Sequence, residues 1–302
     1  MSRPHMTRPP RPADAPAPLK AVPGDRIAFQ GELGANSHEA CVAAFPELEP
    51  APYPTFEDAF DAVKSGVCRL GMIPVENSIA GRVADVHHLL PSSGLKIIGE
   101  RFKPIHFQLM ANRGVKLEDV KTVASMPIAL AQCRKTVRQL KLKTEGVGDT
   151  AGAAKALAEH PDPTRAAISP ALAAEIYGLD ILARDIEDEH TNTTRFLIMT
   201  ADKNPAPPPF TTPCITSFTF KVRNLPAALY KAMGGFATNG VNITKLESYQ
   251  RGTSFAATEF YADLEGRPED ENVARALHEL EFHSKWVRVI GVYPQARPRM
   301  EA

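Results

Sequence analysis

Two short polar segments of the sequence combine side chains that could bind and protonate a small, oxygen-rich substrate. The segment PVENS sets the carboxyl group of Glu76, the amide of Asn77 and the hydroxyl of Ser78 directly after an apolar run. The segment NTTRF places Thr194 and Arg195 just before another apolar run. An arginine can bind a carboxylate through two parallel hydrogen bonds, while a neighbouring threonine hydroxyl meets the reacting group. Taken alone, each segment is more often an ordinary surface turn, so its assignment depends on its neighbours.

A glycine turn near the start of the chain is a third candidate for ligand binding. In FQGELGANS, Gly31 and Gly34 lie between an expected strand and an expected helix, where backbone N–H groups could bind an anion. The segment lacks the full dinucleotide fingerprint and is not a Walker phosphate loop. A tight connection between strand and helix explains it equally well, so carboxylate binding and a plain turn both stay open.

Other common catalytic and metal-binding patterns are missing from the sequence. The chain has no HExxH segment and no GxSxG nucleophile elbow. Its four cysteines, Cys41, Cys68, Cys133 and Cys214, form no CxxC pair, so neither a zinc site nor a disulfide framework has the required spacing. We expect reduced thiols of the kind found in cytoplasmic proteins.

The elements that must position these segments alternate between strand and helix. From residue 26 to about residue 200, short apolar runs alternate with helical periodicity, which is typical of an α/β fold with a largely parallel sheet. One of the expected helices covers residues 128–140. Polar crossings near residues 102–104 and 184–193 divide this region into two lobes, and a ligand would bind in the cleft between them.

A second unit follows a proline-rich linker. Residues 203–213 hold five prolines, and residues 214–295 then follow the order βαββαβ, which is the ferredoxin-like arrangement. Asn239 and Gly240 are expected to end its first helix. Pro268 is expected to open its second helix, where a missing N–H group costs nothing.

The composition limits which partners are possible. The sequence has 35 Lys plus Arg and 35 Asp plus Glu, so it lacks the broad basic field that nucleic acids or anionic membranes require. Its first residues lack the apolar h-region of a secretory signal, and no apolar run approaches the ~20 residues that span a bilayer, so we expect neither export nor membrane insertion. We expect disordered tails at residues 1–25 and 296–302. These observations predict a cytoplasmic cleft enzyme or binding protein for a small anionic ligand.

Six motifs occur in the order found in the prephenate dehydratase family: IAFQGELGANSHEA, GMIPVENSIAGRV, SMPIALAQC, GDTAGAAK, YGLDILARDIEDEHTNTTRF and NITKLES. The chain resembles that family from Arg26 to about Tyr293. The resemblance implies a catalytic domain at residues 26–202, with the two-lobed fold of periplasmic binding proteins, and a regulatory ACT domain at residues 214–295. The family converts prephenate into phenylpyruvate, water and carbon dioxide on the route to phenylalanine, without a metal or an organic cofactor.

The resemblance also implies which residues act on the substrate. Thr194 of the TRF motif would be the general acid toward the departing ring hydroxyl, and Glu76 and Asn77 would be further catalytic residues. Met126 and Ile128 stand where the commoner family pattern has histidine and glutamine, so we expect a contact there to be lost or replaced. The other implied substrate contacts are Ser78, Ser125, Gln132, Asp149, Thr150, Arg195 and Phe196.

For the ACT domain, the resemblance implies phenylalanine as an effector, bound between two paired modules of a homodimer or homotetramer. Two departures concern this domain: PAAL replaces PGAL at residues 226–229, and LESYQ replaces the ESRP ending. Arogenate dehydratase and a non-catalytic amino-acid sensor are the alternative functions. The implied effector contacts are Leu225, Ala227, Ala228, Leu229, Asn242, Ile243, Leu246, Glu247 and Ser248.

Overall fold

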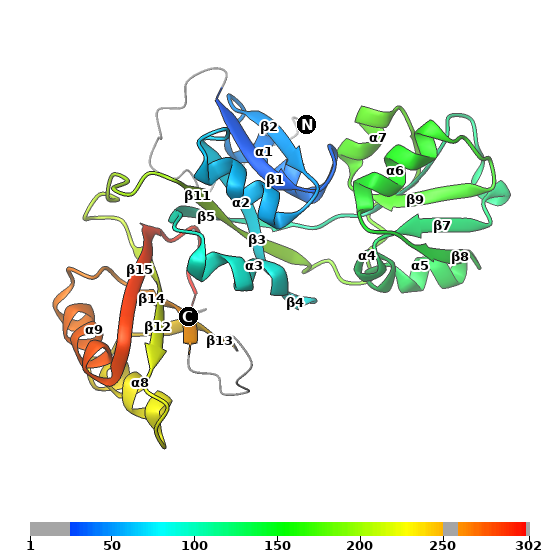
Figure 1. Ribbon diagram of the computed structural model, residues 1–302. Helices are drawn as coiled ribbons and strands as arrows, with labels where there is room; N and C mark the ends of the chain where they lie inside the picture. Colours follow the sequence, from blue (N-terminus) through cyan, green and yellow to red (C-terminus); the bar gives the residue numbers. More distant parts are fainter. Residues whose placement is uncertain (1–24, 250–258, 300–302) are drawn as a thin grey trace, which may run out of the picture.

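The computed structural model describes residues 25–249 and 259–299, and Figure 1 shows their arrangement. The described residues form a ten-stranded sheet with the strand order β13-β14-β12-β15-β5-β11-β3-β1-β2, to which β4 adds beside β3. A separate five-stranded sheet has the order β10-β6-β9-β7-β8. None of the described helices is long and apolar enough to cross a bilayer.

The first lobe is the part of the ten-stranded sheet that runs from β5 to β2. Strands β1 and β3 are parallel, whereas β11 runs antiparallel between β3 and β5. Its strands are β1 (Arg26–Gln30), β2 (Glu49–Tyr53), β3 (Leu70–Asn77), β4 (Gly81–Arg82), β5 (Lys96–Pro104) and β11 (Thr193–Thr200). Its helices are α1 (Asn36–Ala44), α2 (Phe56–Lys64) and α3 (Ala84–Leu89), followed by the 3-10 turn η1 (Leu90–Ser92).

Local chemistry explains two features of this lobe. The hydroxyl of Thr55 accepts the N–H of Asp58 at 3.1 Å, which caps the start of α2.

The strand β2 has the sequence EPAPY and was not predicted, because its two prolines cannot donate to a strand ladder. Because β2 is the edge strand of the sheet, no further strand has to accept hydrogen bonds from the N–H groups that its prolines lack.

The second lobe is the five-stranded sheet with its helices. The chain enters it between β5 and β6 and leaves it between β10 and β11, so the predicted two-lobed α/β fold with two crossings is confirmed. Its strands are β6 (Gln108–Ala111), β7 (Thr122–Ser125), β8 (Lys143–Gly146), β9 (Arg165–Ser169) and β10 (Asp180–Ala183). Its helices are η2 (Leu117–Asp119), α4 (Pro127–Gln132), α5 (Arg134–Gln139), α6 (Thr150–Glu159) and α7 (Ala171–Tyr177).

The single helix predicted over residues 128–140 is wrong. The chain forms two short helices there, because the backbone of Cys133 leaves the helical region at φ −115° and ψ 22°. Cys133 is fully buried in an apolar cluster with Val123 and Ala129, so packing of its side chain accompanies the break.

The C-terminal βαββαβ unit covers residues 214–294. Its strand order, β13-β14-β12-β15, is that of a ferredoxin-like sheet. Gly240, at φ +64°, follows the end of α8 as expected. The second helix begins at Glu271 and not at Pro268, because the Asp270 carboxylate accepts the N–H of Arg267 and forms a turn first. The elements are β12 (Cys214–Val222), α8 (Ala228–Thr238), β13 (Ile243–Tyr249), β14 (Glu259–Glu265), α9 (Glu271–His283) and β15 (Ser284–Pro294).

This unit is joined to the first lobe through the sheet itself. Strand β15 lies parallel to β5, with Gly291 opposite Ile97. A Cβ atom at Gly291 would lie 2.5 Å from the carbonyl oxygen of Ile97, so the close approach requires glycine. The Nζ of Lys96 also donates to the carbonyl of Val289 at 2.9 Å. The proline-rich linker is therefore one connection among several.

A core shared by the first lobe and the βαββαβ unit supports this joint. Tyr261 and Tyr293 are completely buried in one apolar cluster with Val75, Val86 and Ile97 of the first lobe. Burial of apolar side chains is the main favourable contribution when two parts of a protein pack together. The unit therefore docks on the first lobe as a packed body.

The tail predicted at residues 296–302 is wrong for its described part. The N–H of Ala296 donates to Glu100 at 3.1 Å, and the guanidinium groups of Arg297 and Arg299 lie over the ring of Phe102. These contacts fasten the chain end to β5. Residues 1–24, which make up most of the other predicted tail, and residues 300–302 lie outside the described residues. Asp25 belongs to the first lobe, where it pairs with Arg69.

Ala227 provides a stability test, because it adopts φ +59° at the start of α8, a conformation that favours glycine. We expect Ala227→Gly to raise the free energy of unfolding by about 1 kcal/mol. The control is Ala228→Gly at the first position of α8, where no strain is relieved and the free energy of unfolding should fall by less than about 1 kcal/mol. Thermal unfolding of both variants checks this, and a destabilised Ala227→Gly protein would contradict the strain.

Candidate active site

A cavity of about 370 Å³ lies between the two lobes, next to the ends of β3 and β11; we call it the interlobe cavity. Its wall combines side chains of the first lobe with side chains around α4 and α6 of the second. Met126 and Ile128, the two departures from the family pattern, are part of this wall. The predicted site residues that line it are Asn77, Gln132, Asp149, Thr150, Thr194 and Phe196.

Asn77 and Thr194 form a hydrogen-bonded pair at the cavity wall. They lie opposite each other on the antiparallel strands β3 and β11, and Asn77 Nδ2 donates to Thr194 Oγ1 at 2.9 Å. The Oδ1 of Asn77 accepts the N–H groups of Ile79 at 3.0 Å and Ala80 at 2.8 Å, which fixes the amide orientation. Because Asn77 supplies the hydrogen of their shared bond, the hydroxyl hydrogen of Thr194 can donate to a ligand.

Three amide side chains connect the lobes beside this pair. Asn77 Nδ2 donates to Asn192 Oδ1 at 2.7 Å, and Asn192 Nδ2 donates to Gln132 Oε1 at 3.1 Å. Gln132 belongs to α4 of the second lobe, Asn77 to β3 of the first, and Asn192 to the crossing between β10 and β11. Asn192 was missed as a site residue, although it begins the NTTRF segment. The lobes are held together where the proposed acid lies.

Asp149 forms the second-lobe side of the cavity. Its side chain caps α6 by accepting the N–H of Gly152 at 2.6 Å. Burial raises the pKa of this carboxyl group, although the backbone N–H of Gly152 opposes the rise. Thr150, the first residue of α6, is buried and lines the cavity beside it.

The glycine turn after β1 contacts the second lobe. Glu32 pairs with Lys155 at 3.1 Å, and the carbonyl of Leu33 accepts a hydrogen bond from Tyr177 at 2.9 Å. A Cβ atom at Gly34 would lie 2.7 Å from the backbone of Ala173, so the lobes approach closely here. Of the two alternatives left open by the sequence, this geometry favours a structural turn over an anion site.

Two predicted substrate contacts lie elsewhere. Ser125 is fully buried, and its hydroxyl donates to the carbonyl of Ile168 at 2.6 Å inside the second lobe. Ser78 accepts the N–H of Thr193 at 2.9 Å and donates to the carbonyl of Thr191. These hydroxyls hold backbone segments in place, and neither residue lines the interlobe cavity.

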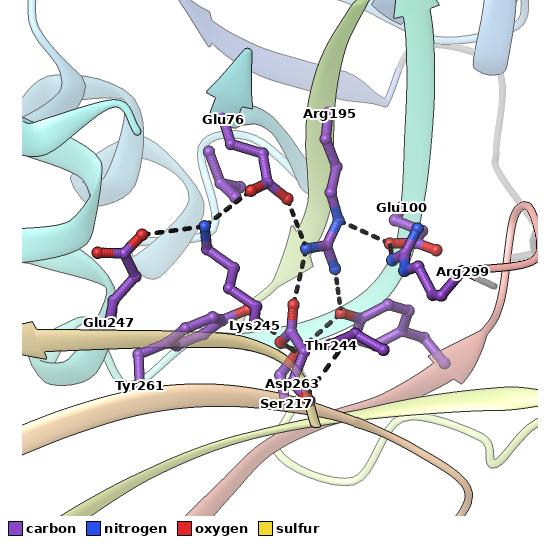
Figure 2. Close-up of polar contacts among 12 residues, drawn as sticks. Glu76, Glu100, Arg195, Ser217, Thr244, Lys245, Glu247, Tyr261, Asp263 and Arg299 are labelled. Atoms are coloured by element: carbon purple, nitrogen blue, oxygen red, sulfur yellow. Dashed lines mark hydrogen bonds and ion pairs between the residues drawn. The ribbon is translucent and has the colours of Figure 1, made fainter. Parts of the chain in front are cut away.

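Arg195 and Glu76 point away from the cavity, contrary to the expectation that they contact substrate. Successive side chains of a strand face opposite sides, so Thr194 and Asn77 cannot face the cavity together with Arg195 and Glu76. Figure 2 shows Arg195 and Glu76 among residues of the βαββαβ unit. Arg195 is only 3% exposed and donates to Glu100 at 2.7 Å, Asp263 at 2.7 Å, Glu76 at 2.9 Å and Tyr293 at 3.0 Å.

Glu76 lies between two cations. Its carboxylate oxygens pair with Arg195 at 2.9 Å and with Lys245 of β13 at 2.7 Å. Burial alone would raise the pKa of Glu76, but Arg195 and Lys245 outweigh it and lower the pKa to about 2. The resulting stabilisation is complete above the ordinary pKa of 4.5 and is lost as the pH falls toward 2.

The predicted effector residues lie at the start of α8 and along β13 with the residue before it. Leu225 is 60% exposed just before α8, and Leu246 is 40% exposed on β13. Asn242 donates to Glu265 at 2.7 Å. Glu247 differs from this expectation, because its carboxylate pairs with Arg82 of the first lobe at 3.3 Å and with Lys245 at 3.2 Å. The remaining predicted residues, Ala227, Ala228, Leu229, Ile243 and Ser248, lie at the start of α8 and along β13.

Among the described residues, one group has metal-ligating atoms in proximity, namely those of His106, Asp185 and Glu187 within 4.8 Å of one another. It lies where the chain crosses between the lobes. Glu187 already accepts the N–H of Phe107 at 2.9 Å and a hydrogen bond from His106 at 2.8 Å. The group therefore joins the two crossings between the lobes, and it lies outside the lining of the interlobe cavity.

Comparison with known proteins places this geometry in a family. Residues 27–204 match the family model described as prephenate dehydratase. The chain belongs to the prephenate dehydratase family. Members of this family are carbon–oxygen lyases of aromatic amino-acid biosynthesis. In this family member, the matched region contains both lobes and the whole interlobe cavity.

Relatives of this prephenate dehydratase family member resemble it over most of its length. A bifunctional N-acyl-homoserine lactone acylase/prephenate dehydratase of Komagataeibacter europaeus is 46% identical, covering 90% of this chain and 96% of the relative. An arogenate dehydratase/prephenate dehydratase of Arabidopsis thaliana is 38% identical, covering 89% and 72%. The solved prephenate dehydratase of Arthrobacter aurescens, in complex with L-Phe, is 31% identical with a TM-score of 0.82 and covers 90% of each chain.

The position of Arg195 in this family member leads to a stability prediction. We expect Arg195→Met to lower the free energy of unfolding by about 3 kcal/mol or more, because three carboxylates would lose a buried cation. The control is Arg275→Met, which breaks an exposed pair within α9 and should cost about 0.5 kcal/mol or less. Urea denaturation measures both. Equal stability of the two variants would contradict a buried role for Arg195.

Proposed function

We propose that this protein is a prephenate dehydratase that converts prephenate into phenylpyruvate, carbon dioxide and water. The observation that carries the proposal is the hydrogen bond from Asn77 to Thr194 at the wall of the interlobe cavity. This bond leaves the hydroxyl hydrogen of Thr194 available for donation to a substrate. It also fixes the position of the Thr194 side chain, as general acid catalysis requires.

The reaction needs an acid more than it needs a nucleophile. The bond between the ring and its carboxylate breaks, and its electron pair enters the ring and completes the aromatic system. The bond between the ring and its hydroxyl breaks at the same time, and the leaving hydroxide takes the proton of Thr194. A proton taken up from the bulk solvent then restores the Thr194 hydroxyl, so the enzyme returns to its starting state and the overall reaction consumes one proton.

The surroundings of Thr194 explain how a weakly acidic hydroxyl can serve. The hydrogen bond from Asn77 draws electron density from Oγ1, and hydrogen bonds in series strengthen one another in a low-dielectric site. The apolar side chains of Phe107, Met126 and Phe196 also line the cavity and reduce its water content. Preorganised donors in such a site stabilise developing charge without a reorganisation cost.

The surface next to the interlobe cavity carries charged groups of both signs. A second cavity of about 570 Å³ shares Ile128 and Gln132 with the interlobe cavity. Its rim carries Arg134 and Arg138, which lie four residues apart on α5 and thus on one helix face. These two arginines are the groups on this rim that could attract a small anion, and the acidic Glu187, Asp188 and Glu189 of the same rim oppose them.

The role of Thr194 can be tested by substitution. We expect Thr194→Ala to fold normally and to lower kcat about 100-fold or more, because the proton donor is gone. Thr194→Ser should retain most of the activity. The control is Thr193→Ala, whose hydroxyl donates to the carbonyl of Thr191 outside the cavity. Phenylpyruvate formation measures the three variants, and near-normal turnover by Thr194→Ala would remove Thr194 from the role of acid.

Arogenate dehydratase is the first alternative. Several relatives carry that name, including a Petunia hybrida protein that is 38% identical over 89% of this chain. The two substrates differ in one group, which is a keto group in prephenate and an ammonium in arogenate. Steady-state kinetics on both substrates distinguish the two activities. Absence of turnover on either would instead favour a non-catalytic amino-acid sensor.

An acylase activity is a second candidate, because the Komagataeibacter europaeus relative is described as bifunctional and is 46% identical. The apolar part of the cavity, with Phe107, Met126 and Ile128, could hold an acyl chain. Release of homoserine lactone from an N-acyl-homoserine lactone tests this activity. If Thr194→Ala abolishes dehydration and leaves that release unchanged, the two activities use different groups.

The βαββαβ unit is proposed to be an ACT regulatory domain that binds phenylalanine between two paired copies of the chain. Support comes from its ferredoxin-like strand order and from the solved relative that contains L-Phe. The exposed side chains of Leu225 and Tyr230 at the start of α8 would then lie at the interface between copies. A homodimer or homotetramer follows from this proposal.

Regulation gives a prediction that does not depend on any substitution. We expect millimolar phenylalanine to lower turnover and to raise the melting temperature, since a ligand that binds only the folded state stabilises it. Tyrosine at the same concentration is the control. Unchanged turnover together with an unchanged melting temperature would show that the chain lacks an intact effector site.

A further inference from the structure

Strand β13 contacts the first lobe through one of its faces. Residues two apart along a strand share a face, and Lys245, Glu247 and Tyr249 are such a set. Leu246 and Ser248, two of the predicted effector contacts, lie on the other face. The three contacts are Lys245 with Glu76 at 2.7 Å, Glu247 with Arg82 at 3.3 Å and Tyr249 with His87 at 3.3 Å.

These contacts reach an irregular point of the catalytic strands. Glu76 lies opposite Arg195 and Pro74 lies opposite Phe196, so Val75 is an extra residue on β3 and forms a bulge. The bulge begins one residue before the Asn77–Thr194 pair. Because a bulge interrupts the ladder of backbone hydrogen bonds, the strand position there depends more on side-chain contacts.

Two lines of contact run from β13 to this bulge. In the first, the Nζ of Lys245 pairs with Glu76, which pairs in turn with Arg195. In the second, His87 Nε2 donates to the carbonyl of Val75 at 3.1 Å, so its Nδ1 can accept from the hydroxyl of Tyr249. Burial lowers the pKa of His87, which favours the neutral ring that this arrangement needs.

The first line is closed to water at Arg195 and nearly so at Lys245, whereas Glu76 between them is 33% exposed. The side chain of Lys245 is 10% exposed, and that of Asp263, which also pairs with Arg195, is fully buried. The buried charges of Lys245 and Arg195 are only weakly screened, so a change in either of them acts on the Glu76 carboxylate between them. Figure 2 shows Lys245, Glu76 and Arg195 in succession.

We propose that Lys245, Glu76 and Arg195 are positioning residues through which strand β13 sets the geometry of the Asn77–Thr194 pair. The inference rests on the proposed dehydratase activity and is independent of which effector binds. Glu76 is the backbone neighbour of Asn77, and Arg195 is the neighbour of Thr194. A displacement of Lys245 therefore changes the hydrogen bond from Asn77 to Thr194 and the direction of the acid proton.

This arrangement predicts an effect on kcat more than on KM. None of the three positioning residues lines the interlobe cavity, so they make no contact with a ligand there. An effector bound to the outer face of β13 would act on turnover directly through the strand. The route bypasses the linker at residues 203–213.

The test compares Lys245→Met, Lys245→Arg and Lys221→Met in the full-length protein. We expect Lys245→Met to lower kcat about 5- to 10-fold with little change in KM. Lys245→Arg keeps the charge and should restore most of kcat. Lys221→Met is the matched control, because it breaks a 2.7 Å ion pair with Glu259 between β12 and β14, away from the catalytic strands.

Hydrogen exchange of the same variants provides a measurement without substrate. We expect faster exchange at residues 75–78 and 193–195 in Lys245→Met only. Unchanged kcat and unchanged exchange in a folded Lys245→Met protein would overturn the inference. If that variant does not fold, Glu76→Gln, which removes the charge at the centre of the first line and keeps the side-chain size, should show the same changes in kcat and exchange. A wild-type protein without dehydratase activity would refute the proposed function, while the exchange data still test the coupling.

Discussion

The buried guanidinium of Arg195 is the group on which the arrangement of the other parts depends. Two of its acidic partners, Glu76 and Glu100, belong to the first lobe, and the third, Asp263, belongs to β14 of the βαββαβ unit. A buried cation needs several acceptors with good geometry to offset its loss of hydration. Only a docked βαββαβ unit completes that set. The same residue orients β11 so that Thr194 faces the interlobe cavity.

The proposed active site relies on neutral groups whose orientation is fixed. The amides of Asn77, Asn192 and Gln132 bond to one another across the junction between the lobes. In this network the Thr194 hydroxyl accepts a hydrogen bond from Asn77 and faces the interlobe cavity. The charged groups that neighbour it in the sequence lie on the opposite face of the same strands. Along β3 and β11, one set of alternate residues thus faces the proposed active site, and the other set contacts the βαββαβ unit.

Much of the fold was predictable from local patterns. Alternating apolar runs predicted the two α/β lobes, and the spacing of the last six elements predicted the ferredoxin-like order, because both depend on short-range periodicity. Strand β2 was missed since its prolines disfavour a strand in isolation. The break at Cys133 and the start of α9 were misplaced, because packing and a side-chain hydrogen bond decide them. Motif resemblance named Asn77, Gln132, Asp149, Thr150, Thr194 and Phe196, which the fold places around one cavity, and their contact with substrate stays a prediction.

The sequence by itself determined the residue types of the site and their order along the chain, since motifs and periodicity are local properties. It also contained the alternation that separates Thr194 from Arg195, although not which of the two faces the cavity. Only the tertiary structure decided that, because the choice depends on where Glu100, Asp263 and Tyr293, all far away in the sequence, place their oxygens. The roles of Lys245 and Asn192 arise in the same way. Their partners belong to other elements, so no local pattern could identify them.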